Sequence, residues 1–144
     1  DSGITVSNSG LNSPLPDMIK YLNFLVGDFS GKKEIYDEIL RRSSLEEMFQ
    51  PTVSAPLDAN GNSGFSTDIG LIFFLDKCGE EIYIGHGGDQ NGFISYLEFN
   101  PKKRTASVLV FNTNIILPEN TPPEKDIFGK LRKAVRQLHE SIKD

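Results

Sequence analysis

The stretch Gly85-His86-Gly87-Gly88-Asp89 places a residue that titrates near neutral pH among residues that let a ligand approach the main chain. Glycine has no Cβ atom, so a carbonyl group could come close to the backbone, where an exposed N–H group stabilises an oxyanion. The His86 imidazole could donate a hydrogen bond or transfer a proton. The alternative is a glycine-rich turn with a surface histidine, and short patterns of this kind are common. Composition alone does not decide between the two.

The remaining candidate sites are weaker. Residues 58–62 begin like a calcium-binding loop, but Ser63 stands where the glycine belongs and Ile69 where the bidentate glutamate is needed. The single cysteine, Cys78, falls in a predicted turn without a basic neighbour in the sequence. His139 is expected on the solvated flank of the last helix. We therefore expect no metal site and no cofactor.

In the first fifty residues, apolar residues recur at the spacing of a helix. Pro14 and Pro16 suit a first helical turn, and apolar residues recur until Gly27 ends the helix. Further helices are predicted over residues 32–42 and 45–49. Residues 51–68 are rich in Pro, Asn, Gly and Ser, which is typical of a loop. This loop is the best internal boundary, although residues 1–144 are expected to form a single domain.

After this loop the pattern becomes that of strands. Residues 69–75, 81–85, 93–99 and 106–111 are predicted strands, with residues 76–79 as a turn and residues 85–92 as a turn that joins the second strand to the third. The short connections predict an antiparallel meander of about four strands. The last helix, about 124–143, should cover the sheet with its apolar stripe: Ile127, Phe128, Leu131, Ala134, Val135, Leu138 and Ile142. The fold class is therefore α+β.

Charge and hydropathy exclude several partners. The net charge of −5 and the lack of a long basic run argue against nucleic acid. No apolar run reaches the roughly 20 residues that a membrane span needs. The chain starts without Met and without the pattern of a signal peptide, which suggests a processed product or a piece of a longer protein.

Two ordered segments carry a family resemblance. Tyr83 to Pro101, which contains His86-Gly87-Gly88 and then Gly92-Phe93-Ile94-Ser95, is followed by a strand that ends in Asn. Upstream, Gly10-Leu11-Asn12-Ser13 precedes Asp17-Met18 and a helix. The chain resembles the C-terminal half of the serine β-lactamase and penicillin-binding-protein superfamily, in the branch of class C β-lactamases, D-alanyl-D-alanine carboxypeptidases and related esterases. The resemblance spans nearly the whole chain.

The resemblance implies a partial β-lactamase/transpeptidase-like fold and a role for the glycine-rich stretch. His86-Gly87-Gly88 would take the place of the family's Lys-Thr-Gly or His-x-Gly triad beside the catalytic cleft. His86 would orient substrate or assist proton transfer, while Gly87 and Gly88 would leave room for the scissile carbonyl. The backbone N–H of Asp89 would supply one of two oxyanion-hole donors. The pair Asn112 and Asn114 would line the rim, and the family's habit suggests a periplasmic or secreted protein.

A credible nucleophile is missing from the sequence. In the family, a Ser-x-x-Lys motif comes first, a Tyr-x-Asn motif second and the triad last. Here Ser30 to Lys33 and Tyr21 to Asn23 match as strings, but in reversed order and inside the helical segment. The chain is expected to be inactive alone and to pair with the N-terminal half of the same hydrolase. The alternative is a non-catalytic module that binds a peptide or a partner subunit. A histidine in the triad favours ester or peptide substrates over β-lactams.

Overall fold

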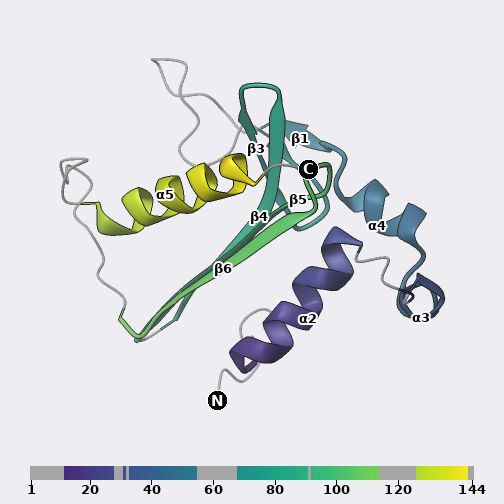
Figure 1. The fold of residues 1–144 in the computed structure, drawn as a ribbon, viewed down its shortest axis with the longest axis horizontal. Coiled ribbons are helices and arrows are strands. Elements are labelled where there is room, and N and C mark those ends of the chain that lie inside the picture. Colours follow the sequence, from purple (N-terminus) through teal and green to yellow (C-terminus); the bar gives the residue numbers. More distant parts are fainter. Residues whose placement is uncertain are drawn as a thin grey trace.

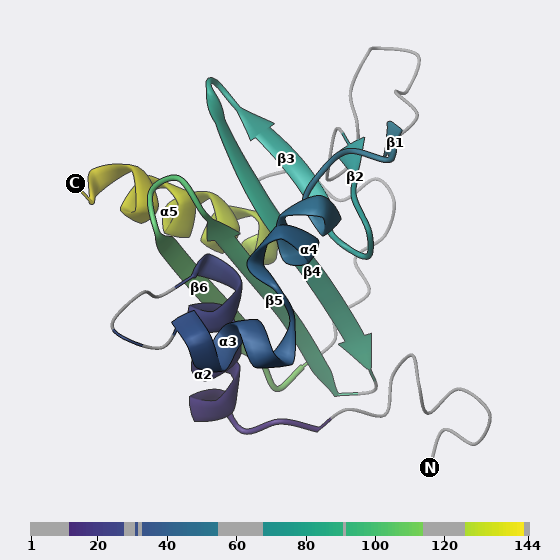
Figure 2. The same cartoon turned by 90° about the vertical axis from the view of Figure 1, so that its right-hand side faces the viewer.

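A computed structural model describes residues 12–27, 31, 33–54, 68–90, 92–113 and 126–142. Its centre is one antiparallel sheet in which each strand pairs with the next along the chain (Figures 1 and 2). The strands are β1 (Val53–Ser54), β2 (Asp68–Ile69), β3 (Phe74–Cys78), β4 (Glu81–Gln90), β5 (Phe93–Asn100) and β6 (Thr105–Phe111). The α+β class and the meander are confirmed, because from β2 to β6 short connections join neighbouring antiparallel strands.

The number and the bounds of the strands differ from the prediction of about four. The apolar run 69–75 is split between β2 and β3 because the chain bends at Ile72, whose φ is 65°. At this bend the N–H of Gly70 donates to the carbonyl of Phe73. Cys78 is the last residue of β3 and not part of a turn. Strand β4 continues to Gln90, so His86 and Asp89 lie in a strand and not in the predicted turn.

Helices α2 (Leu15–Val26), α3 (Lys33–Ile39) and α4 (Arg42–Met48) precede the main strands. The prediction for α2 is accurate: Pro16 lies in its first turn, and Gly27 ends it with a φ of 82°. The boundary between α3 and α4 lies earlier in the chain than predicted. At the start of α4, the Asp37 carboxylate accepts a hydrogen bond from the N–H of Arg42. The core joins α2 and α4 to one face of the sheet and contains Leu22, Leu25, Val26, Leu45, Phe49, Phe73, Leu75, Ile84 and Phe99.

Helix α5 (Ile127–Ser141) lies on the opposite face of the sheet from α2 (Figures 1 and 2). Its first turn is capped by the Asp126 side chain, which accepts the N–H of Gly129. The packing of a final helix on the sheet was expected, but the face that makes the contact was not. Residues Ile127, Leu131 and Leu138 of the apolar stripe are 66%, 38% and 63% exposed. No helix in the described part of the chain is long and apolar enough to cross a membrane.

Candidate functional site

The glycine-rich stretch forms a strand edge with which no described strand pairs. The pairing of β3 with β4 ends at Phe74 opposite Gly85, whereas β5 pairs with β4 as far as Gln90. Figure 2 shows β4 continuing past the start of β3. No described strand therefore pairs with residues 86–89 on the β3 side. Alternate N–H and C=O groups of an antiparallel strand point to each edge, so this edge offers backbone donors and acceptors to a ligand.

His86 is exposed at the start of this edge. Its ring stacks on Phe74, with centroids 5.4 Å apart and planes 24° apart. Across the sheet it pairs with Leu97 of β5. The Phe74 contact limits the directions in which the imidazole can point, while the exposed part of the ring stays accessible to a ligand. The geometry therefore allows proton transfer or hydrogen bonding at this position.

Two of the glycines have a packing role that the sequence did not indicate. A Cβ atom on Gly85 would come within 2.5 Å of the carbonyl oxygen of Leu97 and 2.9 Å of Tyr96 Oη, and one on Gly87 within 3.3 Å of Tyr96 Cδ2. The Tyr96 ring thus lies over the strand where side chains are absent. The guanidinium of Arg132 covers its other face, 3.7 Å from the ring centroid. Burial raises the pKa of Tyr96 to about 12.

Gly88 and Asp89 are exposed toward the end of the hairpin. A Cβ atom on Gly88 would meet only the Ser95 hydroxyl, at 3.1 Å, so this position has space that Gly85 lacks. Asp89 pairs with Ile94 of β5. The predicted backbone donor of Asp89 therefore lies in the same extended strand as His86.

The predicted asparagines are not brought to this edge. Asn112 is exposed and directly follows Phe111, which pairs with Ile94. Because Ile94 also pairs with Asp89, Asn112 lies at the same end of the sheet as Asp89 but two strands away, about 10 Å. Asn114 lies outside the described residues. A shared cleft would therefore need further chain between Asn112 and the β4 edge.

The most extensive electrostatic network joins α5 to the sheet, and sequence reasoning missed it. Arg136 Nε donates to Glu98 Oε2 at 2.9 Å, and its terminal nitrogen also contacts Asp76. Arg132 donates to Asp76 Oδ2 at 3.2 Å. Burial alone would lower the pKa of Arg136, but hydrogen bonds and charges from Glu98 and Asp76 raise it above its ordinary value. These carboxylates are neutralised by arginines, which suits anchoring of the helix better than acid–base chemistry.

His139 is buried, contrary to the prediction that it is solvated. Its side chain faces the sheet at 3% exposure, and Nδ1 lies 2.7 Å from the hydroxyl oxygen of Thr105. The Tyr83 ring contacts it edge to face. Burial lowers the pKa of His139, opposed by Glu98 and assisted by Arg136 and Lys103. A neutral imidazole is therefore part of the packing between α5 and the sheet.

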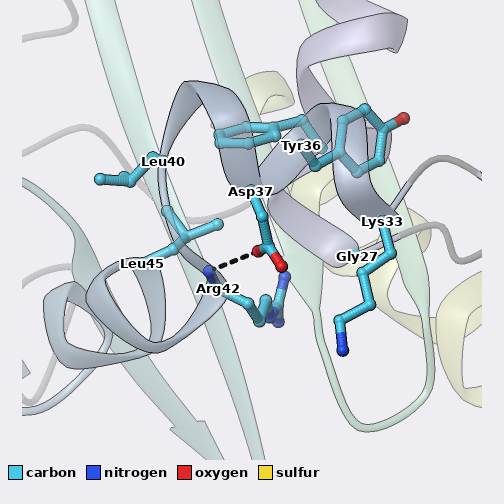
Figure 3. Close-up of a pocket in the computed structure, with 8 residues that line it drawn as sticks. Gly27, Lys33, Tyr36, Asp37, Leu40, Arg42 and Leu45 are labelled. Carbon is cyan, nitrogen blue, oxygen red and sulfur yellow. Dashed lines mark hydrogen bonds between the residues drawn. The ribbon is translucent and has the colours of Figure 1, made fainter.

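A shallow hollow that opens to solvent lies among α2, α3 and α4 (Figure 3). Lys33, Tyr36 and Arg42 are among its lining residues. Arg42 is already engaged, because it donates to the carbonyl of Leu25 at 2.8 Å and to Glu46 at 2.9 Å. The hollow has a volume of about 10 Å³, room for about one water molecule, which is far less than a usual ligand pocket. Among the described residues, no group of His, Cys, Asp or Glu side chains could hold a metal ion.

The described residues of the two nucleophile-like motifs, Tyr21 to Asn23 and Ser30 to Lys33, do not form a site with the β4 edge. Tyr21 and Asn23 are exposed on α2, and Lys33 is the first residue of α3. Ser30 and the calcium-like residues 58–62 lie outside the described residues. Cys78 is exposed, with Sγ 3.9 Å from a carboxylate oxygen of Glu140. None of these described groups contacts the β4 edge.

Comparison of the chain with family models and with curated proteins finds no match. Functional inference therefore rests on the residues and on their arrangement.

Proposed function

We propose that this chain is the C-terminal part of a serine hydrolase of the β-lactamase and penicillin-binding-protein type. It would contribute the His86-Gly87-Gly88 strand as one wall of a cleft, and the N-terminal half of the parent would supply the serine. A partial β-lactamase/transpeptidase-like fold belongs to the same proposal. The substrates would be esters, peptides or β-lactams, with esters and peptides preferred.

One observation carries this proposal: β4 extends past β3, so the resembling residues form a strand edge that no described strand covers. An extended acyl substrate can align along such an edge through main-chain hydrogen bonds. His86 is exposed at the place where this edge begins. At Gly88 a Cβ atom would meet only the Ser95 hydroxyl, at 3.1 Å, so this position is less crowded than Gly85, and its missing side chain suits close approach of a carbonyl group.

The proposed chemistry is acyl transfer in two steps. The serine oxygen of the parent bonds to the substrate carbonyl carbon as the serine proton passes to a base. Collapse of the tetrahedral intermediate breaks the bond to the leaving group, which takes up that proton. Water then repeats the sequence and releases the acid. In this scheme His86 orients the substrate or assists proton transfer, and the N–H of Asp89 is one donor to the oxyanion.

A labelling experiment tests the proposal. The 144-residue chain should remain unlabelled by a fluorophosphonate and by a fluorescent penicillin, because it lacks the nucleophile. A longer chain from the same reading frame should contain an upstream Ser-x-x-Lys motif and become labelled at that serine, with the Ser→Ala variant as control. Stoichiometric labelling of the short chain at Ser30, or an upstream sequence without this motif, would contradict the proposal.

The second candidate is a non-catalytic module that binds a peptide or a partner subunit. The same unpaired β4 edge favours it, because an extended peptide can add to an exposed strand without any chemistry. An in-frame start close to Asp1, together with binding of peptides without turnover, would favour this function. The reading frame upstream of Asp1 separates the two candidates.

A further inference from the structure

A second edge, with which no described strand pairs, lies along β6 at the end of the sheet, and it is apolar. Strand β6 is the last in the sheet order and pairs only with β5 among the described strands. Its sequence, Thr-Ala-Ser-Val-Leu-Val-Phe, contains no charged residue and no proline. Natural edge strands are usually protected by charges, prolines, bulges or covering segments. The β6 edge has neither charge nor proline and is therefore suited to pairing with another strand.

The exposed apolar stripe of α5 lies above this same edge. The side of α5 that includes Arg136 contacts Asp76 of β3, whereas Phe128 packs against Phe111 of β6. Going round the helix at 100° per residue, Leu131 and Leu138 lie beyond Phe128 on the side away from Arg136. The stripe Ile127, Leu131, Leu138 and Ile142, which is 38–66% exposed, therefore faces the β6 side of the molecule.

The midpoint of strand β6 and the midpoint of the α5 stripe lie close together. Phe128 contacts Phe111 at one end of β6, and His139 bonds Thr105 at the other, so the helix and the strand run in opposite directions with their midpoints close together. The midpoint of β6 is Val108. Along the helix, the pair Ile127 and Ile142 and the pair Leu131 and Leu138 have the same midpoint, which lies next to Ala134.

We propose that the β6 edge and the α5 stripe form an interface for a second copy of this chain. A two-fold axis perpendicular to the sheet, just outside the β6 edge beside Val108, would pair β6 with its symmetry mate in the antiparallel direction. Such an axis keeps both α5 helices on the same face and brings Ile127 opposite Ile142 and Leu131 opposite Leu138. This arrangement is isologous, since one patch contacts itself.

The charges near the interface fit a second copy. Two β6 strands bring no like charges together, because the strand has none. In the antiparallel helix pair, the two copies of Lys130 would be nine residues apart along the helix axis, about 13 Å. In a parallel pair they would face each other. The proposal concerns a different edge from the β4 site and does not depend on the proposed hydrolase function.

Sedimentation velocity of the 144-residue chain tests the interface. The expected species has twice the 16.0 kDa mass of one chain. The double substitution Leu131→Glu with Leu138→Glu should raise the dissociation constant at least about 100-fold, because it buries four carboxylates in an apolar contact. The matched control, Ile35→Glu with Ile39→Glu on α3, introduces the same charges at residues that are 59% and 70% exposed and should remain dimeric.

Hydrogen exchange locates the contact independently of mass. Amides of β6 should exchange more slowly in the dimer and faster in the Leu131/Leu138 variant, while circular dichroism stays unchanged. A monomer at concentrations on the order of 100 µM, where dimers of micromolar affinity would form, overturns the proposal. A dimer that the α5 variant leaves intact overturns it as well. So does a longer chain from the same reading frame that is monomeric with β6 amides protected, because another segment of that chain would then occupy the edge.

Discussion

The ring of Tyr96 lies 3.3 Å from the position that a Cβ atom on Gly87 would occupy. Tyr96 also contacts Phe128 of α5 and lies beneath the guanidinium of Arg132. The absence of side chains at the glycine-rich strand therefore allows α5 to dock closely on the sheet. A sequence feature that suggests a catalytic edge also has a structural task on the opposite face of the same strand.

Substitution of these glycines should separate the two roles. Gly85→Ala should lower the free energy of unfolding by about 1–3 kcal/mol, because the new methyl group meets the Leu97 carbonyl of the backbone. Gly88→Ala meets only a side-chain hydroxyl and should change stability by less than about 0.5 kcal/mol. Urea unfolding monitored by circular dichroism measures both. Equal costs at the two positions would show that packing against Tyr96 and Leu97 does not explain the glycines.

The ion network beneath α5 should be sensitive to loss of one arginine. Arg136→Met leaves Glu98 and Asp76 buried with only Arg132 as a cationic partner, so the expected loss is about 3–5 kcal/mol of unfolding free energy. Lys133→Met, an exposed cation on the same helix, should cost less than about 0.5 kcal/mol. Chemical denaturation of the two variants under the same conditions is the measurement. A loss of less than about 1 kcal/mol for Arg136→Met would place this network among weakly contributing surface ion pairs.

Acidification should destabilise the fold through His139. Its pKa is lowered in the folded state, mainly by burial, so the unfolded chain binds a proton first as the pH falls. Stability is therefore retained above the ordinary histidine value of about 6.5 and declines as the pH falls below it. His139→Gln should flatten the decline between about pH 7 and pH 5. Thermal unfolding at a series of pH values measures this slope.

The control for this pH dependence is Gln137→Ala at an exposed position of the same helix, which changes no titratable group and should keep the wild-type slope. Losses at lower pH have another origin. The pKa values of Asp68 and Glu81 are lowered, first by hydrogen bonds from Lys77 and Asn100 respectively, and the stability that they add disappears below about pH 4. An unchanged slope in His139→Gln between pH 7 and 5 would mean that another group titrates there.

The sequence predicted what depends on local pattern and failed where tertiary contacts decide. Alternation placed β5, and Pro16 with Gly27 placed α2, because these signals act within one element. The prediction that the apolar stripe of α5 faces the sheet was right for Phe128, which packs on Tyr96 and Phe111. Much of the stripe is exposed, because Arg132 and Arg136 lie beneath the helix and pair with Asp76 and Glu98 of the sheet. One signal was available: Glu98, between Leu97 and Phe99, is the single charged residue of β5.

For the candidate site too, the sequence predicted the residues but not their conformation. His86 to Asp89 were singled out from residue types, but their assignment to a turn was wrong. Glycine favours turns in isolation, whereas in β4 the Leu97 carbonyl and the Tyr96 ring of the neighbouring strand leave no room for a side chain at Gly85 and little at Gly87. The unpaired edge depends on where β3 starts, which is set by the bend at Ile72. Neither relationship is encoded in a short window of sequence.

Substitution of His86 tests its role in a longer chain that carries the upstream serine. His86→Ala should lower the rate of acylation by about 10²–10⁴-fold, the usual contribution of a positioned acid–base group. Folding should be preserved, because the side chain is exposed and loses only its stacking on Phe74. Phe74→Leu is the matched control: it removes the same stacking contact but keeps the imidazole. Stopped-flow labelling measures acylation, and thermal unfolding measures stability.

If His86→Ala unfolded the protein while the folded fraction kept its specific activity, His86 would have a packing role instead. Equal losses of acylation in both variants would mean that Phe74 acts by positioning the ring.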